Sequence, residues 1–346
     1  MSEKLFPCSI VGSYSQPDWL VYKERLAKSL PPRVRAEDIW RIPAEFLKSA
    51  QDDATRLAIK DMEEAGLDII TDGEIRRESY SNRFATALEG VDIDNAGKAM
   101  DRTGKMHEVP RVVGPIRRKH AVEVEDAEFL LANTTRTTMI SVPGPFTMSQ
   151  QAQNDYYDSD GDMALAYAEA VNAEIRNLHA AGVEIVIIDE PYMEARADAA
   201  REYGVAALQK ALQGVDGKTA VHICFGYGQK VKEKPDQYHF MAEMKDVPCD
   251  RISIETAQPG LDCSVLQELP DHNIMLGVIN LGTQDVDPVG EIVARVERAL
   301  PFIDKERIIL APDCGLKYMP RERAFGKLKN MCESAARLRE RYTNQA

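Results

Sequence analysis

Residues 162–191 read DMALAYAEAVNAEIRNLHAAGVEIVIIDEP, and this stretch decides the fold class. Residues 162–181 have helical periodicity, and Gly182 separates them from the short apolar run Glu184–Ile188. A long helical segment followed at once by a buried strand is the repeating unit of a parallel α/β protein.

The same unit recurs along the chain. Short runs rich in Val and Ile, bounded by Gly, Pro or Asp, predict eight strands: Cys8–Val11, Leu67–Thr71, Thr138–Val142, Glu184–Ile188, Thr219–Ile223, Arg251–Ile254, Asn273–Val278 and Arg307–Leu310. Further helical stretches occupy 51–65, 195–213, 287–300 and 321–341. Eight strands with crossover helices favour a (β/α)8 TIM barrel. A doubly wound sheet is the alternative, but no glycine-rich nucleotide-binding motif follows any strand.

The 346 residues are interpreted as a single catalytic domain, 1–346, because barrels reach this length when they carry insertions. Residues 89–135 interrupt the repeat with scattered polar residues, Gly, Pro and short alternating segments. We predict that they form an insertion between the second and third strands, with a β-hairpin, over one barrel mouth. Residues 14–50 are expected to be irregular loop and short helix.

The composition is that of a globular protein, with 44% hydrophobic and 29% charged residues. A net charge of −13 without a long basic stripe argues against a nucleic-acid partner. The first residues lack a signal-peptide pattern, and no stretch reaches the roughly 18 apolar residues of a membrane span. We therefore expect a cytoplasmic protein with no membrane partner, whose six cysteines are reduced thiols or metal ligands.

Polar residues collect directly after the predicted strands. They are Ser13, Asp72, Glu74, Asp189, Glu190, His222, Cys224, Glu255, Asn280, Asp313 and Cys314. In a (β/α)8 barrel the loops that follow the strands form the active face. The pattern therefore predicts an active site at this mouth of the barrel.

Four of these residues have side chains that suit a metal ion. His222 and Cys224 are two residues apart in AVHICFG, so in an extended strand they point to the same face. Glu255 ends the next strand and Cys314 ends the eighth. One imidazole, two thiolates and one carboxylate favour Zn²⁺. The spacing alone leaves another interpretation open, in which the cysteines pack as small apolar side chains and Glu255 forms a salt bridge.

Six motifs, in order along the chain, resemble those of the cobalamin-independent methionine synthase family, specifically its C-terminal catalytic barrel. They are I-V-G-S at 10–13, D-G-E at 72–74, I-D-E-P at 188–191, V-H-I-C at 221–224, I-S-I-E-T at 252–256 and A-P-D-C-G-L-K at 311–317. Without the N-terminal barrel of the long members, the chain resembles the short, single-barrel forms of this zinc-dependent thiol alkyltransferase superfamily.

The resemblance implies four zinc ligands, His222, Cys224, Glu255 and Cys314, and five residues that bind homocysteine, Val11, Gly12, Ser13, Glu74 and Asp189. The first three of these five would hold its carboxylate and the last two its ammonium group. Such a site suits a zwitterion, which needs donors at one end and carboxylates at the other. Zn²⁺ would deprotonate the thiol, whose pKa is otherwise about 8.5. No catalytic residue is assigned beyond the zinc ligands.

The chain departs from the folate-using members of the family. They carry a histidine proton donor in G-V-Y-D-I-H after the seventh strand, whereas the matching G-V-I-N-L-G here has Gly282 at that position. Their pterin-stacking tryptophan has no equivalent in residues 144–151, and a further carboxylate is replaced by Ala195. We therefore expect methylation of homocysteine or a similar small thiol by a donor other than folate, such as methylcobalamin or a corrinoid protein.

Three alternatives stay open at this stage. The chain could alkylate coenzyme M with an epoxyalkane, in which case Arg76, Arg77 or Arg117 would face the sulfonate. It could be a non-catalytic barrel stabilised by zinc, or a metal-free barrel related to uroporphyrinogen decarboxylase. Glu74 and Asp189 could also have a purely structural role, in which they form ion pairs with nearby arginines such as Arg76 or Arg77 instead of binding a substrate. The sequence leaves open the thiol, the donor and whether the chain forms a homo-oligomer.

Overall fold

Seven parallel strands form the main sheet. In spatial order they are β1 (Ile69–Ile70), β4 (Thr137–Pro143), β6 (Ile185–Asp189), β7 (Lys218–Ile223), β8 (Arg251–Glu255), β9 (Asn273–Ile279) and β10 (Ile308–Pro312). The structure is a computed structural model and describes residues 4–26, 32–101, 104–228, 230–231 and 233–343. These strands fall on seven of the eight predicted runs, and all neighbouring pairs run parallel.

The amino-terminal segment bridges the two outer strands of this sheet. Cys8 pairs in parallel with Leu310 of β10, and Ser9 pairs in parallel with Ile69 of β1. Ser9 N donates to Leu310 O at 2.9 Å, and Ile69 N donates to Cys8 O at 3.1 Å. The remaining predicted run, Cys8–Val11, therefore lies between the two edges of a curled parallel sheet and forms single bridges rather than a strand.

Both faces of the sheet are buried. The side chains of Ile185 and Ile187 belong to an apolar cluster made by the strands alone, whereas Val186 and Ile188 pack in the larger cluster between the strands and the helices. This follows from the two-residue period of a strand, which sends successive side chains to opposite faces. A parallel sheet covered on one face by helices and filled on the other by its own side chains needs such continuous apolar strands.

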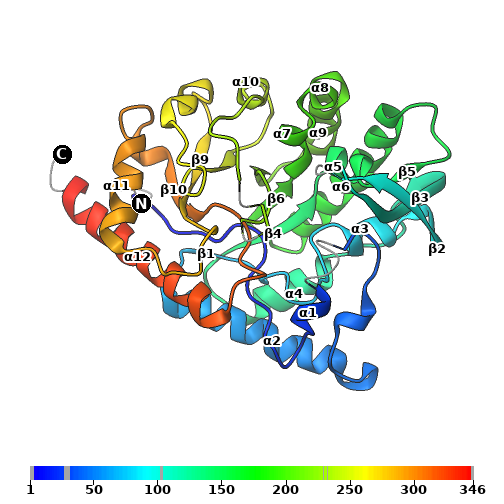
Figure 1. Cartoon of the computed structure of the whole chain (residues 1–346), viewed down its shortest axis with the longest axis horizontal. Coiled ribbons are helices and arrows are strands. Elements are labelled where there is room, and N and C mark those ends of the chain that lie inside the picture. The colour runs from blue at the N-terminus through cyan, green and yellow to red at the C-terminus, as the bar shows by residue number, and fades with distance from the viewer. Residues whose placement is uncertain (1–3, 27–31, 102–103, 229, 232, 344–346) are drawn as a thin grey trace.

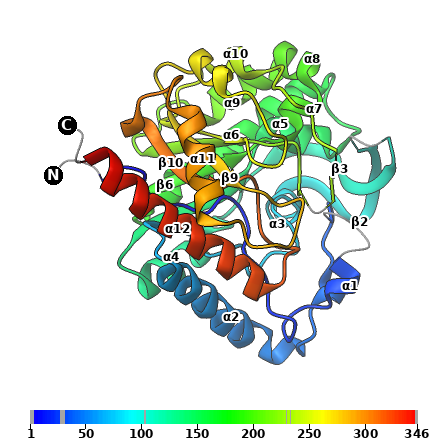
Figure 2. The same ribbon diagram turned by 60° about the vertical axis from the view of Figure 1, so that its left-hand side comes forward.

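Helices surround the sheet. The longer ones are α2 (Ala44–Ala65), α4 (Val124–Asn133), α6 (Asp160–Ala180), α9 (Val205–Leu212), α11 (Val289–Ala299) and α12 (Arg321–Thr343). The shorter ones are α1 (Lys23–Leu26), α3 (Asn82–Thr86), α5 (Pro145–Gln150), α7 (Pro191–Ala195), α8 (Ala197–Ala199), α10 (Met241–Met244), a π-helical turn at Ala200–Gly204, and 3₁₀ turns at Glu37–Ile39, Cys263–Glu268 and Lys305–Arg307. Helices α2 and α12 lie side by side (Figures 1 and 2). Within the described residues, no helix has both the length and the apolarity that crossing a membrane requires.

The start of helix α2 differs from the prediction. Helix α2 begins at Ala44, so the end of the stretch 14–50 is helical rather than irregular. Pro43 directly precedes the helix, and proline is tolerated at a helix start because its missing N–H would be unpaired there in any case. The helix ends at Ala65, and the next residue, Gly66, has a φ of 94°, the left-handed conformation that favours glycine at helix ends.

The predicted insertion at 89–135 contains two kinds of element. Strands β2 (Glu89–Met100) and β3 (Met106–Arg117) form an antiparallel hairpin, and β5 (Gln153–Asn154) adds a third strand to it. Helix α4 follows and belongs to the helical layer (Figure 1). The Arg196 guanidinium donates to Met100 O at 3.1 Å. Because Arg196 follows α7, just after β6, the hairpin reaches the loops at the carboxyl ends of the strands.

Candidate metal and amino acid site

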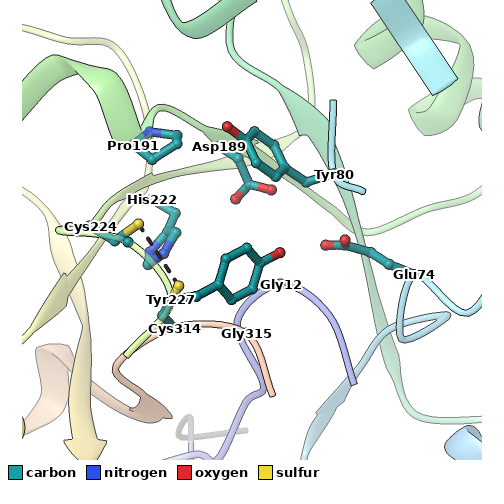
Figure 3. A pocket seen from close by; sticks show the side chains of 11 residues that line it. Gly12, Glu74, Tyr80, Asp189, Pro191, His222, Cys224, Tyr227, Cys314 and Gly315 are labelled. Atoms are coloured by element: carbon teal, nitrogen blue, oxygen red, sulfur yellow. Dashed lines mark hydrogen bonds between the residues drawn. The ribbon is translucent and has the colours of Figure 1, made fainter. Parts of the chain in front are cut away.

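A pocket lies at the carboxyl ends of the strands. It is lined by Gly12, Glu74, Tyr80, Asp189, Pro191, His222, Cys224, Gly226, Tyr227, Cys314 and Gly315 (Figure 3). These residues come from the ends of β6 and β7 and from the segments that follow Cys8–Ser9, β1 and β10, so sequence-distant loops meet at one mouth. The cavity between these side chains measures about 30 Å³.

Two thiols and one imidazole meet on one side of this pocket. His222 and Cys224 come from the end of β7, and Cys314 comes from the loop after β10. The Sγ atoms of Cys224 and Cys314 are 3.9 Å apart. With a ring nitrogen of His222, the three ligand atoms all lie within 4.8 Å of one another, and Figure 3 shows the three side chains converging.

The three side chains fit a zinc ion. Two sulfurs bound to one tetrahedral zinc at about 2.3 Å would lie about 3.8 Å apart, close to the separation of 3.9 Å found here. His222 Nδ1 is hydrogen-bonded to Ser253 Oγ at 3.0 Å, while His222 Nε2 is buried without a hydrogen-bond partner. Metal-binding histidines have this arrangement, because the bonded nitrogen orients the ring and leaves the other for the metal.

In the absence of a cation, the surroundings of the cluster favour the protonated forms of Cys314 and His222. The hydrogen bond from the Cys314 thiol to Cys224, together with burial, raises the pKa of Cys314 well above its usual range. Burial lowers the pKa of His222, but Cys224, Asp189 and Glu255 together outweigh burial, and the net pKa rises to about 9. A bound divalent cation reverses this preference, because it stabilises thiolates and neutral imidazole.

The structure brings three of the four predicted ligands together and pairs the fourth elsewhere. Glu255 ends β8, but it is not part of the group whose ligand atoms all lie within 4.8 Å of one another, which consists of His222, Cys224 and Cys314. It accepts hydrogen bonds from Phe225 N at 2.9 Å and from the Lys234 ammonium. Burial raises the pKa of Glu255, and the adjacent Lys234 ammonium opposes this shift by stabilising the carboxylate.

The two predicted ammonium-binding carboxylates, Glu74 and Asp189, both line the pocket. Glu74 Oε1 accepts from Ser141 Oγ at 2.9 Å, while Glu74 Oε2 and Asp189 Oδ1 are buried and have no hydrogen-bond partner. Burial raises the pKa of Asp189 to about 8, with Glu74 adding to the shift, and burial also raises the pKa of Glu74. A cation between these carboxylates would offset the cost of ionising them.

The nearby arginines are paired with other carboxylates. Arg76 binds Asp52 and Asp126, with closest nitrogen to oxygen distances of 2.6 and 3.1 Å. Arg77 binds Asp72 and Glu123, at 3.4 and 3.2 Å. Among the described residues, neither Arg76 nor Arg77 forms an ion pair with Glu74 or Asp189, so the structural alternative for these two carboxylates is not found.

The stretch predicted to bind the substrate carboxylate is Val11–Ser13. It can offer a ligand backbone groups and the hydroxyl of Ser13. The Val11 side chain packs in the strand-only apolar cluster, so only its backbone is available to a ligand. Gly12 lines the pocket with a φ of 61°, which favours glycine. Ser13 Oγ is buried without a hydrogen-bond partner. A Cβ at Gly315 would lie 2.6 Å from this hydroxyl, so that position also needs glycine.

Two tyrosines in the pocket were missed by sequence reasoning. Tyr227 lies between the cysteines and Glu74, with its hydroxyl directed toward Glu74 (Figure 3). Its ring packs edge-on against Tyr318, with ring centroids 4.9 Å apart. Tyr80 lines the opposite side of the pocket near Asp189. The available signal was position alone, since each tyrosine lies within a few residues of a predicted motif.

Comparison with known proteins supports a family assignment. The sequence matches the model of the family described as "Cobalamin-independent synthase, Catalytic domain" over residues 33–337. It is 28% identical over 347 residues to a methionine synthase of Sulfolobus acidocaldarius, which covers 98% of this chain and 96% of that protein. It is 30% identical over 344 residues to a methionine synthase of Saccharolobus islandicus (strain L.S.2.15 / Lassen #1), covering 97% and 96% respectively.

A solved structure agrees with these sequence matches. It is that of a B12-independent methionine synthase from Shewanella sp. W3-18-1 in complex with selenomethionine, with a TM-score of 0.89 and 30% sequence identity. The alignment covers 98% of this chain and 99% of that one. The family resemblance inferred from the six motifs is thus confirmed, and the chain belongs to the family of cobalamin-independent methionine synthase catalytic domains.

Proposed function

We propose that the chain methylates the thiol of homocysteine, or of a closely similar amino acid thiol, with the help of a zinc ion. The observation that carries this proposal is that Glu74 Oε2, Asp189 Oδ1 and His222 Nε2 are all buried, all without hydrogen-bond partners and all on residues lining one pocket. Buried polar atoms normally have partners, so a missing ligand is the natural explanation. An ammonium group would satisfy the two carboxylates, and a metal ion would satisfy the imidazole.

Family membership supports the acceptor. The relatives in the comparison are named methionine synthases, and the Shewanella structure holds selenomethionine, the selenium analogue of the product methionine. In the proposed arrangement Glu74 and Asp189 orient the ammonium group, and Ser13 with the backbone of Val11 and Gly12 receives the carboxylate.

His222, Cys224 and Cys314 would hold the zinc ion, and Glu255 is the proposed fourth ligand. When bound, zinc would lower the pKa of the substrate thiol so that the nucleophilic thiolate is present near neutral pH. The pocket side chains contribute position, because a thiol held by its amino acid end presents its sulfur at one place only.

The described contacts support a single domain built on a closed barrel. We infer that the Cys8–Ser9 segment acts as the first of eight strands, because it is bridged in parallel to both β10 and β1. We also infer that the insertion is the hairpin of β2 and β3, since α4 belongs to the outer helical layer.

The proposed donor is not a folate. Gly282 N donates to Asn280 Oδ1 at 2.7 Å, and a Cβ at Gly282 would lie 3.1 Å from the Gln258 side chain. His222 is the one histidine among the residues that line the pocket, and it belongs to the metal cluster. Among the described residues that line the pocket, none therefore offers a free imidazole to protonate a pterin. A donor that needs no protonation, such as methylcobalamin or a corrinoid protein, suits it better.

The alternatives are less well supported by the site. A sulfonate such as that of coenzyme M would meet two buried carboxylates, Glu74 and Asp189, whereas Arg76 and Arg77 are engaged by other carboxylates. Arg117 lies in the hairpin and does not line the pocket. A purely structural zinc site is closed, whereas the side chains of this cluster line a pocket.

Replacing Glu74 with glutamine, or Asp189 with asparagine, tests how the thiol is recognised. Each change should weaken homocysteine binding by about 1.5–3 kcal/mol, the scale of a charged hydrogen bond, while zinc content stays unchanged. The binding of homocysteine and of 4-mercaptobutyrate, which lacks the ammonium group, can be compared by calorimetry on zinc-loaded protein. Equal losses for the two thiols would mean that these carboxylates only support the fold.

A further inference from the structure

A buried ion pair blocks the carboxylate that the family motif assigns to the metal. Lys234 lies in the segment between β7 and α10, and its ammonium binds Glu255 Oε2. The side chains of Lys234 and Glu255 are 1% and 0% exposed, respectively. The other carboxylate oxygen, Oε1, accepts from Phe225 N at 2.9 Å. Both oxygens of Glu255 are therefore already engaged by the protein itself.

Glu255 is nevertheless held beside the thiol and imidazole cluster. Phe225, which donates to its carboxylate, directly follows Cys224. The Tyr238 hydroxyl accepts from Glu255 N at 2.9 Å and donates to Ile223 O at 3.0 Å, which ties the end of β8 to the end of β7. The carboxylate thus adjoins the ligand-bearing strand end while Lys234 occupies it.

We propose that Lys234 is the internal counter-cation of Glu255 and competes with a bound metal ion for this carboxylate. The inference rests on the proposed function, because it takes His222, Cys224 and Cys314 as the metal ligands. A buried carboxylate needs a positive partner, and Lys234 supplies one in the metal-free protein. A metal ion that takes Glu255 as its fourth ligand must break this ion pair. The free energy needed to break the pair therefore makes metal binding weaker.

The pair gives the metal-free site a charge-balanced state and sets how tightly the metal is held. Glu255 is 0% exposed, so a carboxylate left without Lys234 would be an uncompensated buried charge. Such a charge destabilises the metal-free protein and strengthens the attraction for an incoming cation. Lys234 therefore acts as a positioning residue that keeps Glu255 off the metal until a metal ion outcompetes the ammonium.

The test is the zinc affinity of Lys234→Met, measured by competition with a chromophoric chelator. Removal of the competing ammonium should tighten Zn²⁺ binding by roughly 10- to 100-fold, the equivalent of one charged hydrogen bond. The metal-free variant should also melt at a lower temperature than the metal-free wild type. Lys230→Met is the matched control, because Lys230 lies in the same segment but its ammonium is over the Tyr318 ring, 5.5 Å from the centroid. That variant should bind zinc as the wild type does.

A second background isolates the role of Glu255. In Glu255→Gln protein, the Lys234→Met change should alter zinc affinity by no more than about twofold, the usual error of additivity, because no carboxylate is left to release. Lys234→Arg keeps the positive charge and should stay near wild type. Lys234→Gln replaces the methionine variant if that protein does not fold.

The outcomes separate this inference from the proposed function. If zinc binds to the wild type but neither Lys234→Met nor Lys234→Gln binds it more tightly, Lys234 does not compete for the carboxylate. The same conclusion follows if the gain is equally large in the Glu255→Gln background. If the wild type binds no zinc, the proposed metal centre itself is wrong and the inference falls with it.

Discussion

Replacing Cys314 with serine should remove most of the zinc from the purified protein and weaken zinc binding more than about 100-fold. The Sγ atom of Cys314 lies 3.9 Å from that of Cys224, the spacing of two sulfurs on one tetrahedral ion. Losing even a residue that only orients a ligand commonly costs 10- to 100-fold in metal affinity, so losing a thiolate ligand should cost more. The measurement is zinc content after dialysis against a chelator, followed by competition titration.

Cys249→Ser provides the matched control for this prediction. Cys249 is half-buried, and it is absent from both the pocket lining and the metal-ligand cluster. Its serine variant should retain wild-type zinc content, whereas Cys224→Ser should behave like Cys314→Ser. Full zinc occupancy in both Cys224→Ser and Cys314→Ser would show that the metal is bound elsewhere.

Methyltetrahydrofolate should be a negligible methyl donor. With homocysteine as the acceptor, its turnover should be lower than that of methylcobalamin by a factor of about 10² to 10⁴. That factor is the usual contribution of a general acid, and the position of the family's proton donor is Gly282 here. Loss of the pterin contacts should lower the folate rate further. The measurement is methionine formation, followed chromatographically, with zinc-loaded protein and one donor at a time.

Two side chains in the pocket are the candidates if this expectation fails. The hydroxyls of Tyr80 and Tyr227 are near Asp189 and Glu74, respectively (Figure 3). Burial raises the pKa of Tyr227 well above its usual range, which makes its hydroxyl a poor acid. Folate turnover equal to that of every activated donor tried would contradict the argument from Gly282. Loss of that turnover in Tyr80→Phe or in Tyr227→Phe would then identify the proton source.

Much of the fold could be predicted from local patterns. The strand runs were recognisable because both faces of a parallel sheet are buried, which makes each strand a continuous apolar segment such as Ile185–Ile188. The predicted helix boundaries were less accurate. Helix α2 begins at Ala44, whereas the predicted helical stretch begins at residue 51. Its first turns are largely exposed, so they lack the apolar periodicity that marks a packed helix.

The sequence by itself determined which chemistry is possible at the site. His222 and Cys224 share a face because the side-chain period of a strand is two residues, a purely local property. Cys314, Glu74 and Asp189 were identified as candidates because each follows a predicted strand, where barrel enzymes carry their functional groups. The motif order then pointed to the family that the comparisons confirm.

Only the tertiary structure decided which of these groups meet. Curling of the sheet brings Cys314 to within 3.9 Å of Cys224 across 90 positions of sequence. The structure also pairs Glu255 with Lys234 and places Tyr227 in the pocket. Neither could be predicted, because loop side chains have no periodicity and their positions are set by contacts with distant segments.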